Sequence, residues 1–122
     1  MTQLKNTILQ VPAENDYLVA VRAIVAATAA HSGLPVGYCD KARTAAHEAA
    51  GLIMLGNPQG PITCEIGEGE DTITVTISAV TADEIQADPT NIAWVLLDSA
   101  TQTHSISYEG STAGITFTIA AD

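Results

Sequence analysis

Two pairs of β-prone segments constrain the fold of this chain most strongly. In one segment Ile73, Val75 and Ile77 alternate with threonines, the pattern of a strand with one buried and one solvent-facing side. The turns 67–71 and 109–113 contain glycine and join the two members of each pair. The sequence therefore predicts two antiparallel hairpins, which use four segments: 62–66, 72–78, 103–108 and 114–120.

Apolar residues at helical spacing predict two long helices before the first hairpin. The first helix begins at Tyr17 and is expected to end at Ser32 and Gly33, because glycine favours a helix C-terminus. The second covers 39–55, and its buried stripe is rich in alanine. A run of Gly, Asn and Pro at 56–61 then breaks the helix.

Three further segments complete the order of elements. A β-prone run at 4–11 ends at Pro12, an acidic loop covers 80–89, and a short, very apolar helix covers 92–100. The order β-α-α-β-β-α-β-β fills residues 1–122 as a single domain. It predicts an α+β, two-layer α/β sandwich, in which helices cover one face of a mixed, mostly antiparallel sheet.

Charge and hydropathy narrow the classes of partner. The chain carries 14 acidic and four basic residues, a net charge of −10. Nucleic acid would be repelled and a basic protein attracted, although solubility alone also explains such a charge. No apolar run is long enough to span a membrane and no leader pattern is present, so a cytoplasmic protein without membrane contact is expected. Cys39 and Cys64 are expected to be buried reduced thiols, with a single disulfide as the alternative.

Four segments together carry a resemblance to a known superfamily: VPAENDYLVAVRAIVAA, KARTAAHEAAGLI, ITCEIGEGEDTITVTISA and AWVLLDSATQTHSISYEGSTAGITFTI. They resemble the histidine-kinase-like ATPase domain of histidine kinases, gyrase and bacterial anti-sigma factors, and most of all the actinobacterial anti-sigma-F type. The resemblance implies the fold of that superfamily and an anti-sigma factor, a homodimer that keeps a sigma factor from core RNA polymerase. An antagonist protein would free the sigma factor by taking its place.

The nucleotide motifs implied by the resemblance are degenerate in this chain. Glu48 matches the glutamate of the family's Glu-x-x-x-Asn, but the metal-binding Asn is replaced by Leu52, which has no oxygen to offer Mg²⁺. The adenine-binding Asp falls on Ala79, and the glycines that cover the phosphates are missing from 83–91. We therefore expect no cofactor, no metal and no catalytic residue, with Glu48 as a remnant.

Surface residues are the remaining candidates for function. Arg22 on the first helix is a candidate partner contact, with an intramolecular ion pair as the alternative. Asp83, Glu84 and Asp88 in the acidic loop could meet a basic surface of the sigma factor, with a plain solvated loop as the alternative. Trp94 is expected in the core, although part of its helix could be exposed.

Other chemistry finds less support in the sequence. His47 beside Glu48 could suggest acid–base work, but no third group to orient them is apparent, and a solvated pair is the simpler interpretation. The three histidines lack ligand spacing. The alternatives to an anti-sigma factor are an ATP-dependent Ser/Thr protein kinase built around Glu48, which would act on an antagonist, and a pseudo-kinase scaffold that binds antagonist domains alone.

Overall fold

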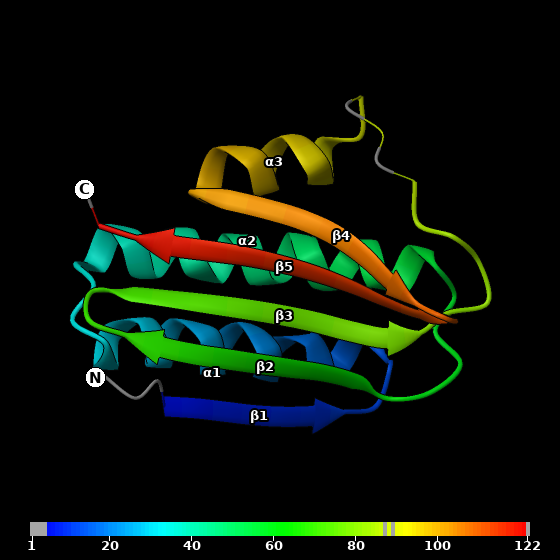
Figure 1. Ribbon diagram of the computed structural model, residues 1–122, viewed down its shortest axis with the longest axis horizontal. Helices are drawn as coiled ribbons and strands as arrows, with labels where there is room; N and C mark the ends of the chain where they lie inside the picture. The colour runs from blue at the N-terminus through cyan, green and yellow to red at the C-terminus, as the bar shows by residue number, and fades with distance from the viewer. Residues whose placement is uncertain (1–4, 87, 89, 122) are drawn as a thin grey trace.

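The β-prone segments form one five-stranded sheet in which every pairing is antiparallel (Figure 1). The structure is a computed structural model that describes residues 5–86, 88 and 90–121. The strand order is β1-β2-β3-β5-β4. The bounds are β1 Lys5–Val11, β2 Ile62–Gly69, β3 Thr72–Val80, β4 Thr103–Glu109 and β5 Thr112–Ala120.

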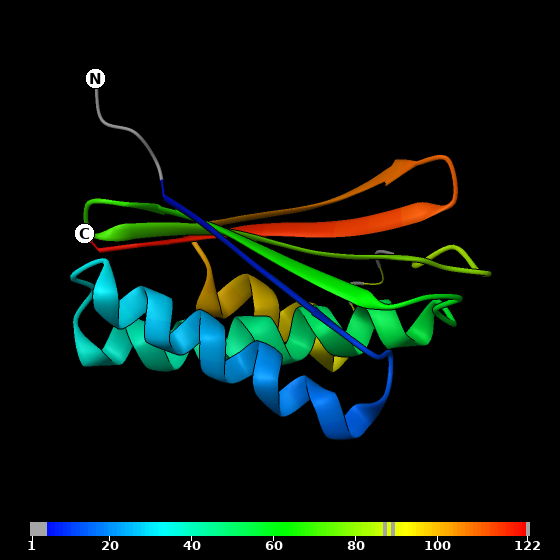
Figure 2. The ribbon, with the colours of Figure 1, turned by 90° about the horizontal axis from the view of Figure 1, so that it is seen from below.

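The helices all lie on one face of this sheet and make the second layer (Figure 2). Helix α2 runs along the middle of the layer, with α1 on one side of it and α3 on the other (Figure 1). A 3-10 turn, η1, leads into α1. The bounds are η1 Asn15–Tyr17, α1 Leu18–His31, α2 Val36–Leu55 and α3 Ile92–Ala100. No helix in the described ranges has the length and apolar character needed to cross a membrane.

The core fills the space between sheet and helices, as the alternation in the strands predicts. Val75 of β3 faces Phe117 of β5, and both are fully buried. The alanines of α2 are buried too, and small side chains let this helix lie close to the sheet and to α1. The opposite face of the sheet carries hydroxyl groups: Thr76 and Thr116 form a cross-strand hydrogen bond of 2.9 Å.

The α+β class, the two layers and the order of elements are confirmed, and three details are corrected. The sheet is wholly antiparallel rather than mixed. Helix α2 begins three residues early, because the Pro35 carbonyl accepts hydrogen bonds from the N–H groups of Tyr38 and Cys39. The hairpin strands are longer than expected, because pairing continues to tight turns, one of which uses Gly110 at φ 63°. Leu4 of the expected first strand lies outside the described residues.

Candidate functional site

The positions that would bind a nucleotide in the resembling family lie in the apolar core. Leu52 is 1% exposed and Ala79 on β3 is 4% exposed, opposite Ala113 of β5. Glu48 lies one turn before Leu52 on α2 and is half-buried. Neither Leu52 nor Ala79 offers a side-chain oxygen, so this region cannot position a hard cation or read a base edge through them.

The loop after β3 packs back onto the C-terminal end of α2. The Asp83 N–H donates to the Gly56 carbonyl and the Ala82 N–H donates to the Asn57 carbonyl, each at 3.0 Å. Ile85 is only 6% exposed and lies against Gly56, where an added Cβ would come within 2.9 Å of its Cγ1. Ile85 therefore fills the space above the C-terminal end of α2.

Two side chains from later in the chain hold the same loop on its other side. The Tyr108 hydroxyl of β4 accepts from the Ile85 N–H at 2.6 Å and donates to the Ile85 carbonyl at 3.0 Å. The Trp94 indole N–H of α3 donates to the Gln86 carbonyl at 2.9 Å. These contacts satisfy backbone groups that would otherwise be buried without partners, and they keep the loop on the body of the protein.

A small cavity remains between this loop and α2. Its volume is about 220 Å³, below the roughly 300–1,000 Å³ of typical small-molecule pockets. Glu84 and Asp88 stand at it and would repel phosphate. The lining residues are Leu52, Leu55, Glu84, Ile85, Gln86, Asp88 and Asn91.

The acidic residues of the loop are exposed, and one of them has a fixed position. Asp88 accepts hydrogen bonds from the Thr90 hydroxyl at 2.7 Å and the Thr90 N–H at 2.9 Å. These bonds lower the pKa of the Asp88 carboxyl below its ordinary value. Asn91 then caps α3, accepting from the Ala93 N–H at 2.9 Å. Asp83 and Glu84 are exposed beside them, so the loop presents negative charge near the start of α3.

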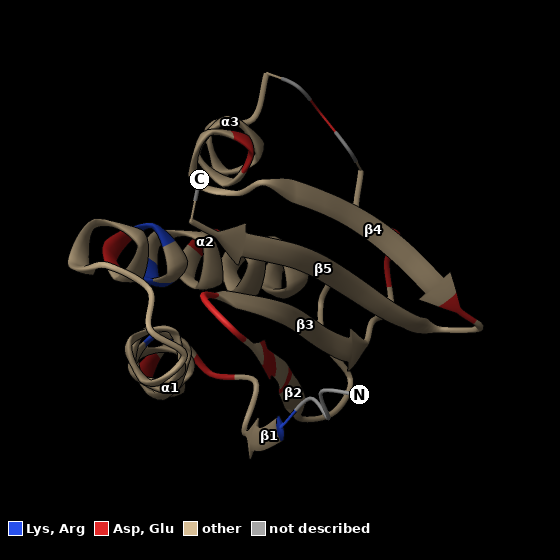
Figure 3. Ribbon diagram, turned by 60° about the vertical axis from the view of Figure 1, so that its left-hand side comes forward, with Lys and Arg blue, Asp and Glu red and all other residues tan. Residues whose placement is uncertain are grey.

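Arg22 lies apart from this acidic loop. It belongs to α1, on the opposite side of α2 from α3 (Figure 3). Its guanidinium donates to Nδ1 of His47 on α2 at 3.1 Å, so its partner within the described residues is an imidazole rather than a carboxylate. The sequence-predicted partner residues therefore fall into two separate places.

The histidines belong to separate contacts. His31 contacts Glu68 at the end of the sheet, and His104 is 3.0 Å from Asp98. Among the described residues no three His, Cys, Asp or Glu side chains gather as metal ligands. Cys39 and Cys64 are both buried and free, as expected.

Helix α3 shows a feature that the sequence only suggested. Trp94 is buried, as expected, together with Leu97. Ile92, Val95 and Leu96 point the other way and are exposed. The sequence signal was present, because no polar residue occurs from Ile92 to Leu97. The helix therefore has two apolar faces, of which one covers the core.

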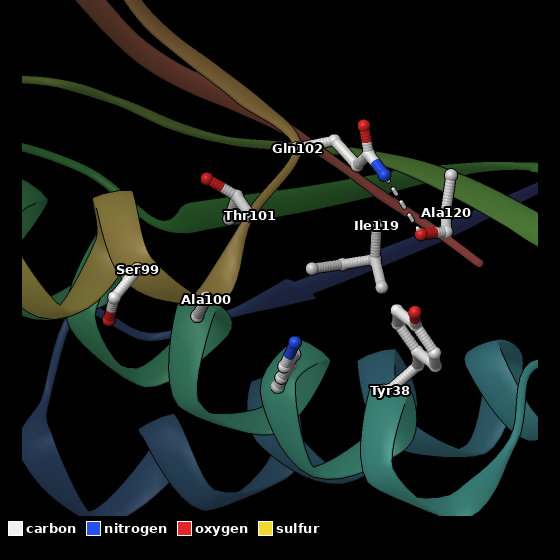
Figure 4. Close-up of a pocket in the computed structure, with 8 residues that line it drawn as sticks. Tyr38, Ser99, Ala100, Thr101, Gln102, Ile119 and Ala120 are labelled. Carbon is white, nitrogen blue, oxygen red and sulfur yellow. Dashed lines mark hydrogen bonds between the residues drawn. The ribbon is translucent and has the colours of Figure 1, made fainter. Parts of the chain in front are cut away.

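A second cavity, of about 290 Å³, lies where α2, the end of α3 and the end of β5 meet (Figure 4). Its polar groups already have partners: the Gln102 amide donates to the Ala120 carbonyl at 3.2 Å and the Thr101 hydroxyl to the Leu97 carbonyl. The Lys41 amine is 5.1 Å from the centroid of the Tyr38 ring. Sequence reasoning missed this cavity because three distant segments form it.

Comparison with known proteins identifies no family for this chain. The sequence matches no protein-family model and none of the curated proteins with which it was compared.

Proposed function

We propose that this chain is an anti-sigma factor of the histidine-kinase-like ATPase type, which binds a sigma factor through its surface and regulates transcription without ATP. One observation carries the non-catalytic part of the proposal. Ile85 packs on Gly56 and lines the small cavity at the end of α2 together with the buried Leu52. In our proposal this is the region that a nucleotide would have to enter. The resemblance of the four sequence segments carries the choice of a sigma factor as partner.

The mechanism we propose is occlusion. The domain would cover the polymerase-binding face of a sigma factor, and a competing antagonist protein would release it. The charge of −10 favours a basic partner surface, and complementary charge speeds association and selects partners. A homodimer in the cytoplasm is part of the proposal, as the resemblance implies.

The first test is binding to the sigma factors of the organism that encodes the chain. Each sigma factor is mixed with the purified protein, and size-exclusion chromatography with light scattering gives the mass of any complex. We expect one sigma factor to form a 1:1 or 2:1 complex and to lose activity in transcription in vitro. If every sigma factor elutes alone, the anti-sigma proposal is wrong.

The second test separates this proposal from the kinase alternative. Isothermal calorimetry with ATP and Mg²⁺ is expected to show no binding, and the sigma complex is expected to form equally well without nucleotide. Tight ATP binding would instead favour a kinase built around Glu48. Capture of antagonist domains with no sigma factor bound would favour a pseudo-kinase scaffold.

A further inference from the structure

The outward side of α3 is an apolar surface that no described residue of this chain covers. We define the outer α3 stripe as Ile92, Val95 and Leu96, which are 67%, 47% and 36% exposed. Their spacing of three and four residues places them on one side of the helix, opposite Trp94 and Leu97. A helix that is apolar all round is normally buried. Here one side packs on the core and the other faces solvent.

A further exposed apolar residue, at the end of α2, lies near the N-terminal end of the stripe. Leu55, the last residue of α2, is 67% exposed. It lines the cavity of about 220 Å³ together with Leu52 and Asn91, the residue immediately before the stripe. The stripe therefore has a depression at its N-terminal end, into which a partner's side chain can insert. Contiguous exposed apolar surface of this kind marks interaction sites.

The charged residues around the stripe are mostly acidic. Glu84 and Asp88 stand at its N-terminal end, and Asp98 follows it on the same helix, with 78% of its side chain exposed. The chain has no Lys or Arg after Arg43, and its basic residues lie on β1, α1 and the first half of α2 (Figure 3). Lys41 lines the cavity at the other end of α3, away from Glu84 and Asp88. The N-terminal end of the stripe is therefore strongly acidic.

We propose that the outer α3 stripe docks an amphipathic helix of a partner protein, whose aliphatic side chains pack on Ile92, Val95 and Leu96. The lysines or arginines that flank them lie against Glu84 and Asp88. Apolar anchors with charged flanks are the usual form of helix recognition on a groove or ledge. This inference deepens the proposed function, in which the sigma factor supplies the helix.

A second copy of this chain fits the stripe poorly. Two stripes facing each other across a two-fold axis would set Glu84 and Asp88 of one copy against acidic residues of the other, which costs free energy. These would be the same two residues if the helices run parallel, and Asp98 if they run antiparallel. The basic residues of the chain lie on other elements, namely β1, α1 and the first half of α2. A basic helix from another protein satisfies both the apolar surface and its acidic end.

A model peptide tests the chemistry without knowledge of the partner. The probe is a dye-labelled helical peptide of about 18 residues with leucines at stripe spacing and lysines elsewhere, and its matched control has glutamates for the lysines. Fluorescence anisotropy is measured with the wild-type chain, Val95→Asp and the control Val36→Asp. Val36 is 80% exposed on α2, so both variants replace an exposed valine by aspartate.

We expect the lysine peptide to bind and the glutamate peptide not to bind. Val95→Asp should weaken binding by about tenfold or more, since it places a charge against leucine. Val36→Asp should bind as the wild type does, and Glu84→Gln should reduce the dependence of affinity on salt. Circular dichroism and amide NMR spectra check that each variant is folded.

These experiments distinguish a failure of the docking inference from a failure of the anti-sigma proposal. The inference is overturned if the lysine peptide does not bind, if both peptides bind equally, or if Val95→Asp binds as the wild type does. It is also overturned if a sigma factor binds and Val95→Asp leaves that affinity unchanged, although the anti-sigma proposal then stands. If the peptide binds through the stripe while no sigma factor binds, the partner of the stripe is another basic helix and the anti-sigma proposal falls.

Discussion

Tyr108 and Ile85 are joined twice: the tyrosine hydroxyl accepts from the isoleucine N–H at 2.6 Å and donates to its carbonyl at 3.0 Å. A side chain of the edge strand β4 thus supplies hydrogen bonds to loop backbone groups that have no strand or helix partner. The residues are 23 positions apart, and the contact fixes the loop that packs on the C-terminal end of α2. The stability of the protein should therefore depend on how this loop packs.

Replacing Tyr108 by Phe removes both hydrogen bonds and leaves the ring. We expect the free energy of unfolding to fall by about 1–3 kcal/mol, because the Ile85 N–H loses its partner in a part-buried place. Urea denaturation measures the loss, and hydrogen exchange should show faster exchange at Ile85. The control is Tyr17→Phe, whose hydroxyl forms no hydrogen bond within the described residues. Equal stability of the two variants would contradict the double contact.

Gly56 is expected to tolerate no side chain. An added Cβ would lie 2.9 Å from Ile85 Cγ1, 3.1 Å from Thr81 Cγ2 and 3.2 Å from the Asp83 carbonyl oxygen. Gly56→Ala should therefore cost about 1–3 kcal/mol of stability. Gly51→Ala is the matched control: nothing lies within 4 Å of its added Cβ, so the change should stabilise α2 by about 0.5–1 kcal/mol. Thermal denaturation of the two variants should give shifts of opposite sign.

Leu52→Asn would restore the amide of the family motif without restoring a nucleotide site. Leu52 is 1% exposed, so a buried amide without a built partner should destabilise the fold by roughly 2–5 kcal/mol. Calorimetry should still show no binding of ATP with Mg²⁺, because Ile85 keeps its place on Gly56. Leu52→Met, of similar volume, should cost less than about 1.5 kcal/mol. Strong ATP binding by the asparagine variant would mean that one side chain had closed the site.

Burial raises the pKa of the Cys64 thiol from 9.0 to about 12. The unfolded chain therefore loses this proton at lower pH than the folded chain does. The contribution of Cys64 to stability is fully present below pH 9.0 and is lost as pH rises towards 12. We expect the free energy of unfolding to fall more steeply over this range in the wild type than in Cys64→Ala. Urea denaturation at several alkaline pH values measures both slopes.

Thiol labelling gives a second measurement of the same burial. In a Cys39→Ala background, Cys64 should react with a disulfide reagent only as fast as the protein opens, because the thiolate is the nucleophile and the thiol is buried. Adding urea should raise the rate steeply. Fast labelling of the native protein would show that Cys64 is accessible.

Sequence patterns predicted those parts of the fold that depend on near neighbours. Helix α3 has both expected ends, because an asparagine cap precedes a run of apolar residues and its last turn leads into a strand. Alternation in β3 predicted which of its side chains are buried. The start of α2 was missed because Pro35 accepts the first hydrogen bonds while its own φ and ψ remain extended.

The candidate site was predictable only in what it lacks. Leu52 and Ala79 were recognisable as residues without oxygen ligands. The packing of Ile85 on Gly56 and the contact of Arg22 with His47 join residues 29 and 25 positions apart, so no periodic pattern indicates them. The outer α3 stripe was visible as an apolar run, but a sequence does not show which of two apolar faces a helix buries.

The helix-free side of the sheet has a practical consequence. Alternate residues of β3 and β5 lie on this side, and most are threonines that are at least partly exposed, so their side chains add strand propensity without filling the core. Thr74 and Thr118 are therefore suitable positions for spin labels or fluorophores. Probes attached there would follow assembly with a partner from the side farthest from the helices. They would remove the long contact of 3.4 Å between the Thr74 and Thr118 hydroxyls but would not enter the buried core.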